Sequence, residues 1–192
     1  MLPVLSRTLA ENHKRNIDLS VYILSIFYIL SNYQQFQELL TENKVGLSII
    51  DVLENQIQRF DLLYSEYIEM WRKNNEEDRV NAKKKLKILN VLIWKQDKLF
   101  FVCLNILFNI SSNPAIEKKM RKAGLVQILI RCLERNDFHL LIVTLGFLRK
   151  LSVIADYKEQ MVPVLLCSWR WVLCRNCRDS SRVITKFFSI FR

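Results

Sequence analysis

The most informative segment of the chain is residues 99–133, which read LFFVCLNILFNISSNPAIEKKMRKAGLVQILIRCL. Its first part, Leu99 to Ile110, is almost wholly apolar and is predicted to form a buried helix. Asn113 can then cap a short, charged helix that has Pro114 at its first position, where the missing N–H costs nothing. After an Ala-Gly break, Leu125 to Leu133 carry apolar side chains at helical spacing. The segment therefore predicts three consecutive helices.

The pattern of this segment occurs more than once along the chain. Asp137 can cap a helix over Phe138 to Leu151, in which Leu151 matches Ile110, 41 positions earlier. An earlier copy starts at Leu30, which matches Ile110 at a spacing of 80 positions, about twice as large. A short, a medium and a long helix in a unit of about 40 residues are typical of the armadillo repeat, whose units bury their apolar faces against their neighbours. We therefore predict an all-α fold, an armadillo-type α-solenoid fragment, with the related HEAT-like packing as the alternative.

The interval between the two copies contains a segment without the repeat pattern. Two apolar stripes, one from Leu63 and one from Ala82, are separated by the wholly polar residues 73–78. This arrangement predicts an inserted, charged helical hairpin. The expected organisation is 1–55 for the partial and first armadillo-type repeats, 56–95 for the charged helical insertion, 96–162 for further repeats, and 163–192 for a basic Cys/Trp tail. The tail fits no repeat, and a shifted reading frame or a retained intron would explain it.

The formal charge of +10 is concentrated in two segments of the chain. Residues 71–95 carry eight Lys or Arg against three Asp or Glu, and residues 163–192 carry six against one. The basic hairpin and tail therefore allow an alternative function, that of a helical-repeat protein binding nucleic acid or an acidic partner. A nucleic-acid partner is disfavoured, because the run of Lys83, Lys84, Lys85 and Lys87 lacks interleaved aromatic residues. We expect these lysines on the solvated side of the hairpin.

The sequence offers no parts for catalysis or for a cofactor. It has no Gly-rich phosphate loop, no nucleophile elbow and no paired metal-binding histidines. Cys167, Cys174 and Cys177 would supply only three of the four ligands that a structural zinc site needs. We therefore expect no enzyme activity, no metal, no cofactor and no small-molecule substrate.

The longest apolar runs, residues 19–30 and 99–110, are too short to cross a bilayer, which takes roughly 20 residues. They are predicted to be buried helices, so no membrane span is expected. No secretory signal is visible at the start, and the five scattered cysteines suit a reducing compartment. These features predict a cytoplasmic protein.

Several short segments point to one protein family. They are Leu2-Pro3-Val4-Leu5, Cys103-Leu104 through Leu107-Phe108-Asn109, Lys119-Met120-Arg121, Asp137-Phe138 with Leu140 to Val143, and Phe147 to Ser152. With these segments the chain resembles the kinesin-associated proteins, the accessory subunits of the heterotrimeric kinesin motor, over about residues 2–162. The resemblance implies an adaptor that binds the tails of the motor chains and cargo adaptor proteins. It also implies a role in microtubule-based transport, notably in cilia, and a location at microtubules or in the cilium.

Asn105 and Asn109 share one face of a predicted helix, and Arg149 and Lys150 occupy the equivalent face one unit further on. A partner peptide would lie on the concave surface of a solenoid, so these four residues, together with the lysines of the hairpin, are the predicted partner-binding residues. The alternative is that the two amides only cap or bridge adjacent helices.

Overall fold

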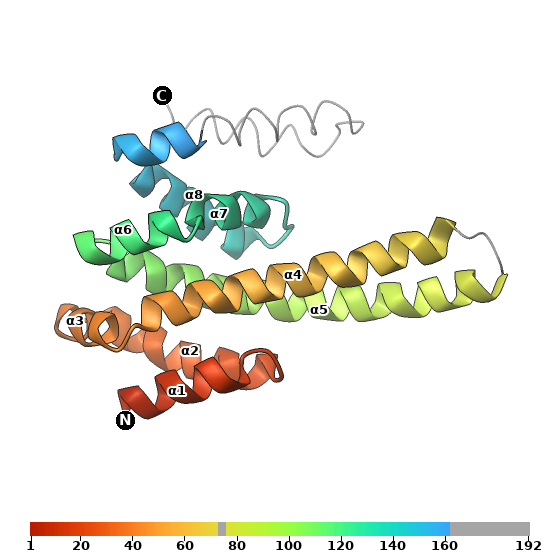
Figure 1. Ribbon diagram of the computed structural model, residues 1–192, viewed down its shortest axis with the longest axis horizontal. Coiled ribbons are helices and arrows are strands. Elements are labelled where there is room, and N and C mark those ends of the chain that lie inside the picture. Colours follow the sequence, from red (N-terminus) through yellow and green to blue (C-terminus); the bar gives the residue numbers. More distant parts are fainter. Residues whose placement is uncertain (73–75, 162–192) are drawn as a thin grey trace. The chain divides into compact units, whose positions relative to one another are not determined.

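A computed structural model describes residues 1–72 and 76–161, and it is helical with no strand in these ranges (Figure 1). The helices are α1 (Leu2–Asn12), α2 (Ile17–Ser31), α3 (Gln34–Glu42), α4 (Val45–Arg72), α5 (Glu76–Ile110), α6 (Pro114–Lys122), α7 (Leu125–Leu133) and α8 (Phe138–Leu151). Residues 155–161 are also helical. The predicted all-α, solenoid-like fold class is therefore confirmed.

Local signals in the sequence set several of these helix ends. Asp137 caps α8, since its Oδ1 accepts a hydrogen bond of 2.7 Å from the N–H of Leu140. Asn16 caps α2 in the same way, through the N–H of Leu19 at 3.0 Å. Gly124 separates α6 from α7 with a φ of +70°, in the left-handed region that side chains other than glycine rarely adopt.

The chain divides into two compact units, Met1–Ile116 and Glu117–Arg192. In the first unit, α2 and α4 both pack against α5. The apolar core of this unit is formed mainly by Ile23, Leu24, Phe27, Ile49, Ile50, Leu53, Leu99, Phe100, Leu104 and Leu107. Gly46 lets the start of α4 approach the end of α5, because a Cβ at this position would lie 3.1 Å from Cδ1 of Ile110.

Helices α4 and α5 form a long hairpin and lie side by side along it (Figure 1). Both helices run without a break through the predicted boundaries of the insertion at residues 56 and 95. The reason is in the sequence, because no glycine or proline occurs between Gly46 and Pro114 to end either helix. The hairpin arms are therefore extensions of the helices that build the core, and the division of the chain into repeats and insertion stays a prediction.

A buried polar cluster lies at the base of the hairpin. The side-chain amide of Gln96 donates to the main-chain carbonyl of Gln56 at 2.6 Å, and the amide of Gln56 donates to the carbonyl of His13 at 3.4 Å. Both glutamines are fully buried. The cluster links the end of α1 to α4 and α5 inside the first unit.

In the second unit, α7 packs against α8, and Tyr157 joins this core from residues 155–161. The Tyr157 hydroxyl donates to the main-chain carbonyl of Glu117 at 3.0 Å. Burial and the nearby Glu117 raise the pKa of Tyr157 above its ordinary value. The predicted Cys/Trp tail of residues 163–192 lies outside the described residues.

One prediction about the apolar runs is wrong in part. Tyr22, Ile26 and Ile29 belong to the run that was expected to be buried, yet all three are exposed. They lie on the face of α2 opposite its buried residues. None of the described helices is both long and apolar enough to span a membrane.

Candidate functional site

The exposed face of α2 carries an apolar stripe. Tyr22, Ile26 and Ile29 are spaced at i, i+4 and i+7, which places them on one side of the helix axis, and the exposed Tyr33 follows in the turn after α2. Tyr22 and Ile29 are the most exposed of the stripe, at 71% and 59%. Single exposed apolar residues are ordinary, but a continuous stripe of four is typical of a surface that contacts another molecule. We call these four residues the α2 stripe.

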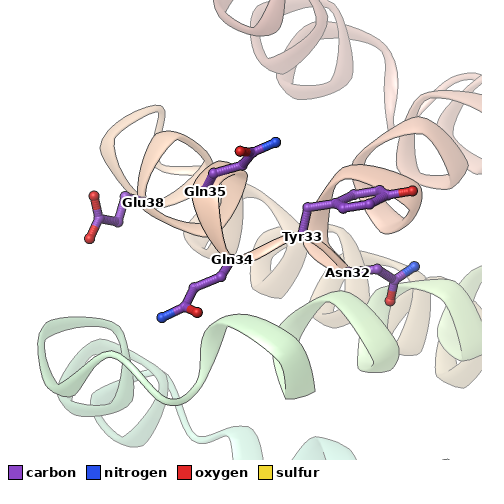
Figure 2. A pocket seen from close by; sticks show the side chains of 5 residues that line it. All are labelled: Asn32, Tyr33, Gln34, Gln35 and Glu38. Carbon is purple, nitrogen blue, oxygen red and sulfur yellow. The ribbon is translucent and has the colours of Figure 1, made fainter.

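A shallow polar hollow lies at the turn between α2 and α3, where the α2 stripe ends. It is lined by Asn32, Tyr33, Gln34, Gln35 and Glu38. Figure 2 shows Gln34 and Gln35 pointing in opposite directions from the start of α3, so their amides reach different parts of the surface. These amides and the carboxylate of Glu38 can hydrogen-bond a peptide, whereas the hollow contains no nucleophile with an adjacent base.

The predicted site residue Asn109 lies next to this hollow. Its side-chain amide donates to Oγ of Ser31 at 2.9 Å and to Oδ1 of Asn32 at 3.1 Å. Asn105, one turn earlier, donates to the main-chain carbonyl of Phe101 at 2.8 Å. Asn109 therefore bridges α5 to the end of α2, as the alternative interpretation of these amides expects, and it orients Asn32 at the edge of the hollow. A direct role of either residue in partner binding stays a prediction.

The other predicted residues of the concave surface belong to the second unit. Arg149 is exposed and Lys150 is half-buried. Both lie in the last turn of α8, where a positive charge interacts favourably with the helix dipole. Burial lowers the pKa of Lys150 from its ordinary value. Arg149 is therefore the more accessible of the two cations, and partner binding by this pair also stays a prediction.

The lysine run on α5 does not point uniformly to solvent. Lys83, Lys84 and Lys87 are exposed, whereas Lys85 is half-buried and forms an ion pair with Glu66 of α4. Lys85 therefore corrects the expectation that all four lie on the solvated side. Its spacing places it on the side of α5 that faces α4, where it joins the two arms of the hairpin.

Within the residues that the structure describes, no three His, Cys, Asp or Glu side chains gather to hold a metal ion. Cys103 and Cys132 are buried in the cores of the first and second unit. The two histidines are also divided between the units, since His13 follows α1 and His139 lies in α8.

The α2 stripe is the feature that sequence reasoning missed. Residues 19–30 are apolar on nearly all sides of the helix, and Ser31, Asn32 and Tyr33 follow, so the outer stripe is hidden within a largely apolar run. The sequence did contain one signal for this surface. Residues 19–30 have more apolar side chains than the single stripe that a helix buries against its core.

Comparison with known proteins gives one result for the family. The model of the family described as Kinesin-associated protein (KAP) matches residues 1–176, which extends beyond the resemblance to residues 2–162 noted in the sequence. No solved structure matches the chain. Since the family model covers most of the sequence, from its first residue into the segment after α8, the chain belongs to the kinesin-associated protein family.

Proposed function

We propose that the chain is a non-enzymatic adaptor that holds the tails of kinesin motor chains and connects them to cargo adaptor proteins. The observation that carries this proposal is the match to the kinesin-associated protein family over residues 1–176. The family is one of accessory subunits, and the helical scaffold with an exposed apolar stripe is suited to holding other proteins.

The setting of this function is microtubule-based transport, and we extend the proposal to transport along cilia. Its support is the association of the family with kinesin, a motor that moves on microtubules. A location at microtubules or in the cilium belongs to the same proposal.

The α2 stripe is the surface that we propose for a motor tail segment. Residues 17–43, which contain α2 and α3, have three acidic residues and no Lys or Arg. Burial of a side chain such as Tyr22 or Ile29 contributes about 1.5 to 3 kcal/mol before the costs of association are subtracted. The neighbouring amides of the hollow can satisfy polar groups of the bound segment. The segment that fits this surface is therefore apolar and carries no excess of negative charge.

The test is capture of the paired tails of the heterotrimeric kinesin motor by the full chain. We expect the unmodified chain to capture the tails and the Y22S/I29S variant to bind them at least tenfold more weakly. A matched control is V4S/V153S, which also removes two exposed apolar side chains but lies outside the α2 stripe. Failure of the unmodified, helical chain to capture the tails would contradict the adaptor function itself.

The cations of α8 are tested in the same assay. The R149E/K150E variant is expected to bind the tails more weakly if these two residues contact an acidic part of the motor tail. Unchanged capture would remove both residues from the proposed surface and would leave the α2 stripe to be judged by its own variant.

A further inference from the structure

A second exposed apolar stripe lies on α5, in the arm of the hairpin. Its members are Val80, Ile88, Val91 and Trp94, each more than half exposed. They lie on the side of the helix opposite Ala82, Leu89, Leu92 and Gln96, which are buried. We call Val80, Ile88, Val91 and Trp94 the α5 stripe.

Lysines surround the α5 stripe on the same face. Lys84 and Lys87 fall between Val80 and Val91 at helical spacing, and Lys83 lies beside them. All three are exposed, and none forms an ion pair with a side chain that the structure describes. At the other end, Nζ of Lys98 lies 3.5 Å from the centre of the Trp94 ring.

Among the residues whose side chains the structure describes, two lysines of α5 form ion pairs. Lys85 forms an ion pair with Glu66. Nζ of Lys95 lies 2.6 Å from Oδ2 of Asp18. Lys85 lies on the side of α5 that faces α4, and Lys95 follows Val91 by one turn. The lysines within the α5 stripe keep their charge available to a molecule that covers the apolar residues.

We propose that the α5 stripe docks an acidic amphipathic helix of a partner protein. From Val80 to Trp94 the stripe extends over about 21 Å at 1.5 Å per residue, which matches four turns of a second helix. The exposed lysines alternate with the apolar residues, so the face offers both apolar contact and charge pairing, and Trp94 has the size of an anchor residue. Glutamates or aspartates that flank the apolar side of the incoming helix would pair with Lys84 and Lys87.

The apolar members of the stripe favour a protein helix over nucleic acid. Ile88 and Val91 occupy the centre of the face between the lysines, and neither can contact a phosphate favourably. Neither aliphatic side chain gives bases a surface to stack on, and Nζ of Lys98 lies over the ring of Trp94, the aromatic member of the stripe. The hairpin itself is a suitable platform, because α4 supports α5 through the buried side of the hairpin and through the pair of Glu66 with Lys85. A docked helix would complete a three-helix arrangement.

The test uses the full chain and a fluorescein-labelled helical peptide of about 18 residues, long enough to cover the stripe. The peptide has leucines on one helical face and glutamates elsewhere. A control peptide replaces every glutamate with lysine. Fluorescence anisotropy should show binding of the glutamate peptide and at least tenfold weaker binding of the lysine peptide at low salt.

Two variants of the stripe separate charge from apolar contact. K84E/K87E should weaken binding of the glutamate peptide about tenfold or more, and I88S should weaken it about fivefold. The matched control for charge is K118E/K119E, which reverses two exposed lysines on α6. The matched control for apolar contact is I142S, because Ile142 on α8 is 53% exposed and Ile88 is 58% exposed. Both controls should bind like the unmodified chain, and circular dichroism should show equal helicity for all of them.

Several results would overturn the inference. They are no binding of the glutamate peptide at about 100 μM by the folded chain, equal binding of both peptides, or an equal loss in the α6 control variant. Binding of a DNA duplex that K84E/K87E abolishes and I88S leaves unchanged, with no preference for the glutamate peptide, would identify a polyanion surface in its place. The proposed adaptor function is judged separately, since it depends on capture of the motor tails and not on this peptide.

Discussion

The buried glutamine pair at the base of the hairpin gives the sharpest test of how the fold is held together. Gln56 and Gln96 are both fully buried, and Gln96 donates to the main-chain carbonyl of Gln56 at 2.6 Å. The perturbation is replacement of each glutamine by leucine, alone and together. Leucine is close to glutamine in volume, so the change removes the polar groups without a large cavity.

The expected magnitude follows from what each variant leaves unpaired. Q96L removes the donor to Gln56 and leaves buried acceptors in α4 without this partner, which costs about 1 to 3 kcal/mol. Q56L removes the donor to His13 and part of the environment of the Gln96 amide, with a similar cost. In Q56L/Q96L the main-chain carbonyls of Gln56 and His13 still lack their side-chain donors, but the 3.4 Å contact between Nε2 of Gln96 and Oε1 of Gln56 is removed on both sides and leaves no unpaired side-chain group behind. The double variant should therefore lose less than the sum of the single losses, by about 0.5 to 3 kcal/mol.

The assay is urea unfolding followed by far-ultraviolet circular dichroism, with the unfolding slope compared between variants to confirm that the same surface is exposed. Hydrogen exchange read by mass spectrometry then shows whether the weakening lies in α4 and α5, as the structure requires, or elsewhere. Additive losses, to within about 0.5 kcal/mol, would refute the reasoning, because the two amides would then be independent of each other.

Three further predictions concern single contacts. In Gly46→Leu, a side chain must enter the space 3.1 Å from Cδ1 of Ile110, so the free energy of unfolding should fall by about 1 to 3 kcal/mol in urea, whereas Gly46→Ala should be nearly neutral. Tyr157→Phe should cost about 1 kcal/mol at neutral pH through the lost hydrogen bond to Glu117. Because the pKa of Tyr157 is raised, its hydroxyl stays protonated in the folded state above about pH 10, where the unfolded chain loses the proton. The unmodified chain should therefore lose stability above this pH. The difference in unfolding free energy from Tyr157→Phe should shrink there in urea titrations. Asn109→Ala should lower the free energy of unfolding by about 1 to 2 kcal/mol, and unchanged stability would contradict the bridge between α5 and α2.

Short-range chemistry explains which helix ends the sequence could predict. Pro114 starts α6, Gly124 separates α6 from α7, and Asp137 caps α8, each at the predicted place. These residues act through their own backbone or the next turn, so their effect does not depend on the remainder of the fold. The starts of the three helices between Pro114 and Leu151 were therefore predictable to the residue.

The lengths of α4 and α5 depend on a different kind of signal. The repeat pattern ends near Gln56 and resumes near Gln96, and the loss of pattern suggested a separate element between them. A helix continues, however, until something stops it, and no proline or glycine does so here. The change in pattern at these two residues marks where α4 and α5 leave the core, not where either helix ends.

The candidate surfaces depend on which neighbours a helix lacks, and a single helix sequence does not contain that information. The amide of Asn109 bonds the end of α2, a segment 77 positions away, and the sequence of α5 alone does not identify this partner. Tyr22 was predicted to be buried because it stands in an apolar run, but α2 buries only one of its sides. Both outcomes are set by tertiary contacts, which the local sequence pattern of a helix does not identify.

The two exposed stripes of the first unit differ in charge, and this difference bears on how an adaptor could join two proteins. The α2 stripe belongs to a region with acidic residues and no Lys or Arg, whereas the α5 stripe is surrounded by exposed lysines. An acidic helix that fits the α5 stripe would be repelled by the α2 region, whereas a basic or neutral apolar segment would bind the α2 stripe in preference to the α5 stripe. Binding at the α5 stripe should accordingly weaken as salt rises, while binding at the α2 stripe, which depends on apolar contact, should change little. Two partners could therefore be held by one unit of this chain without competing for the same surface.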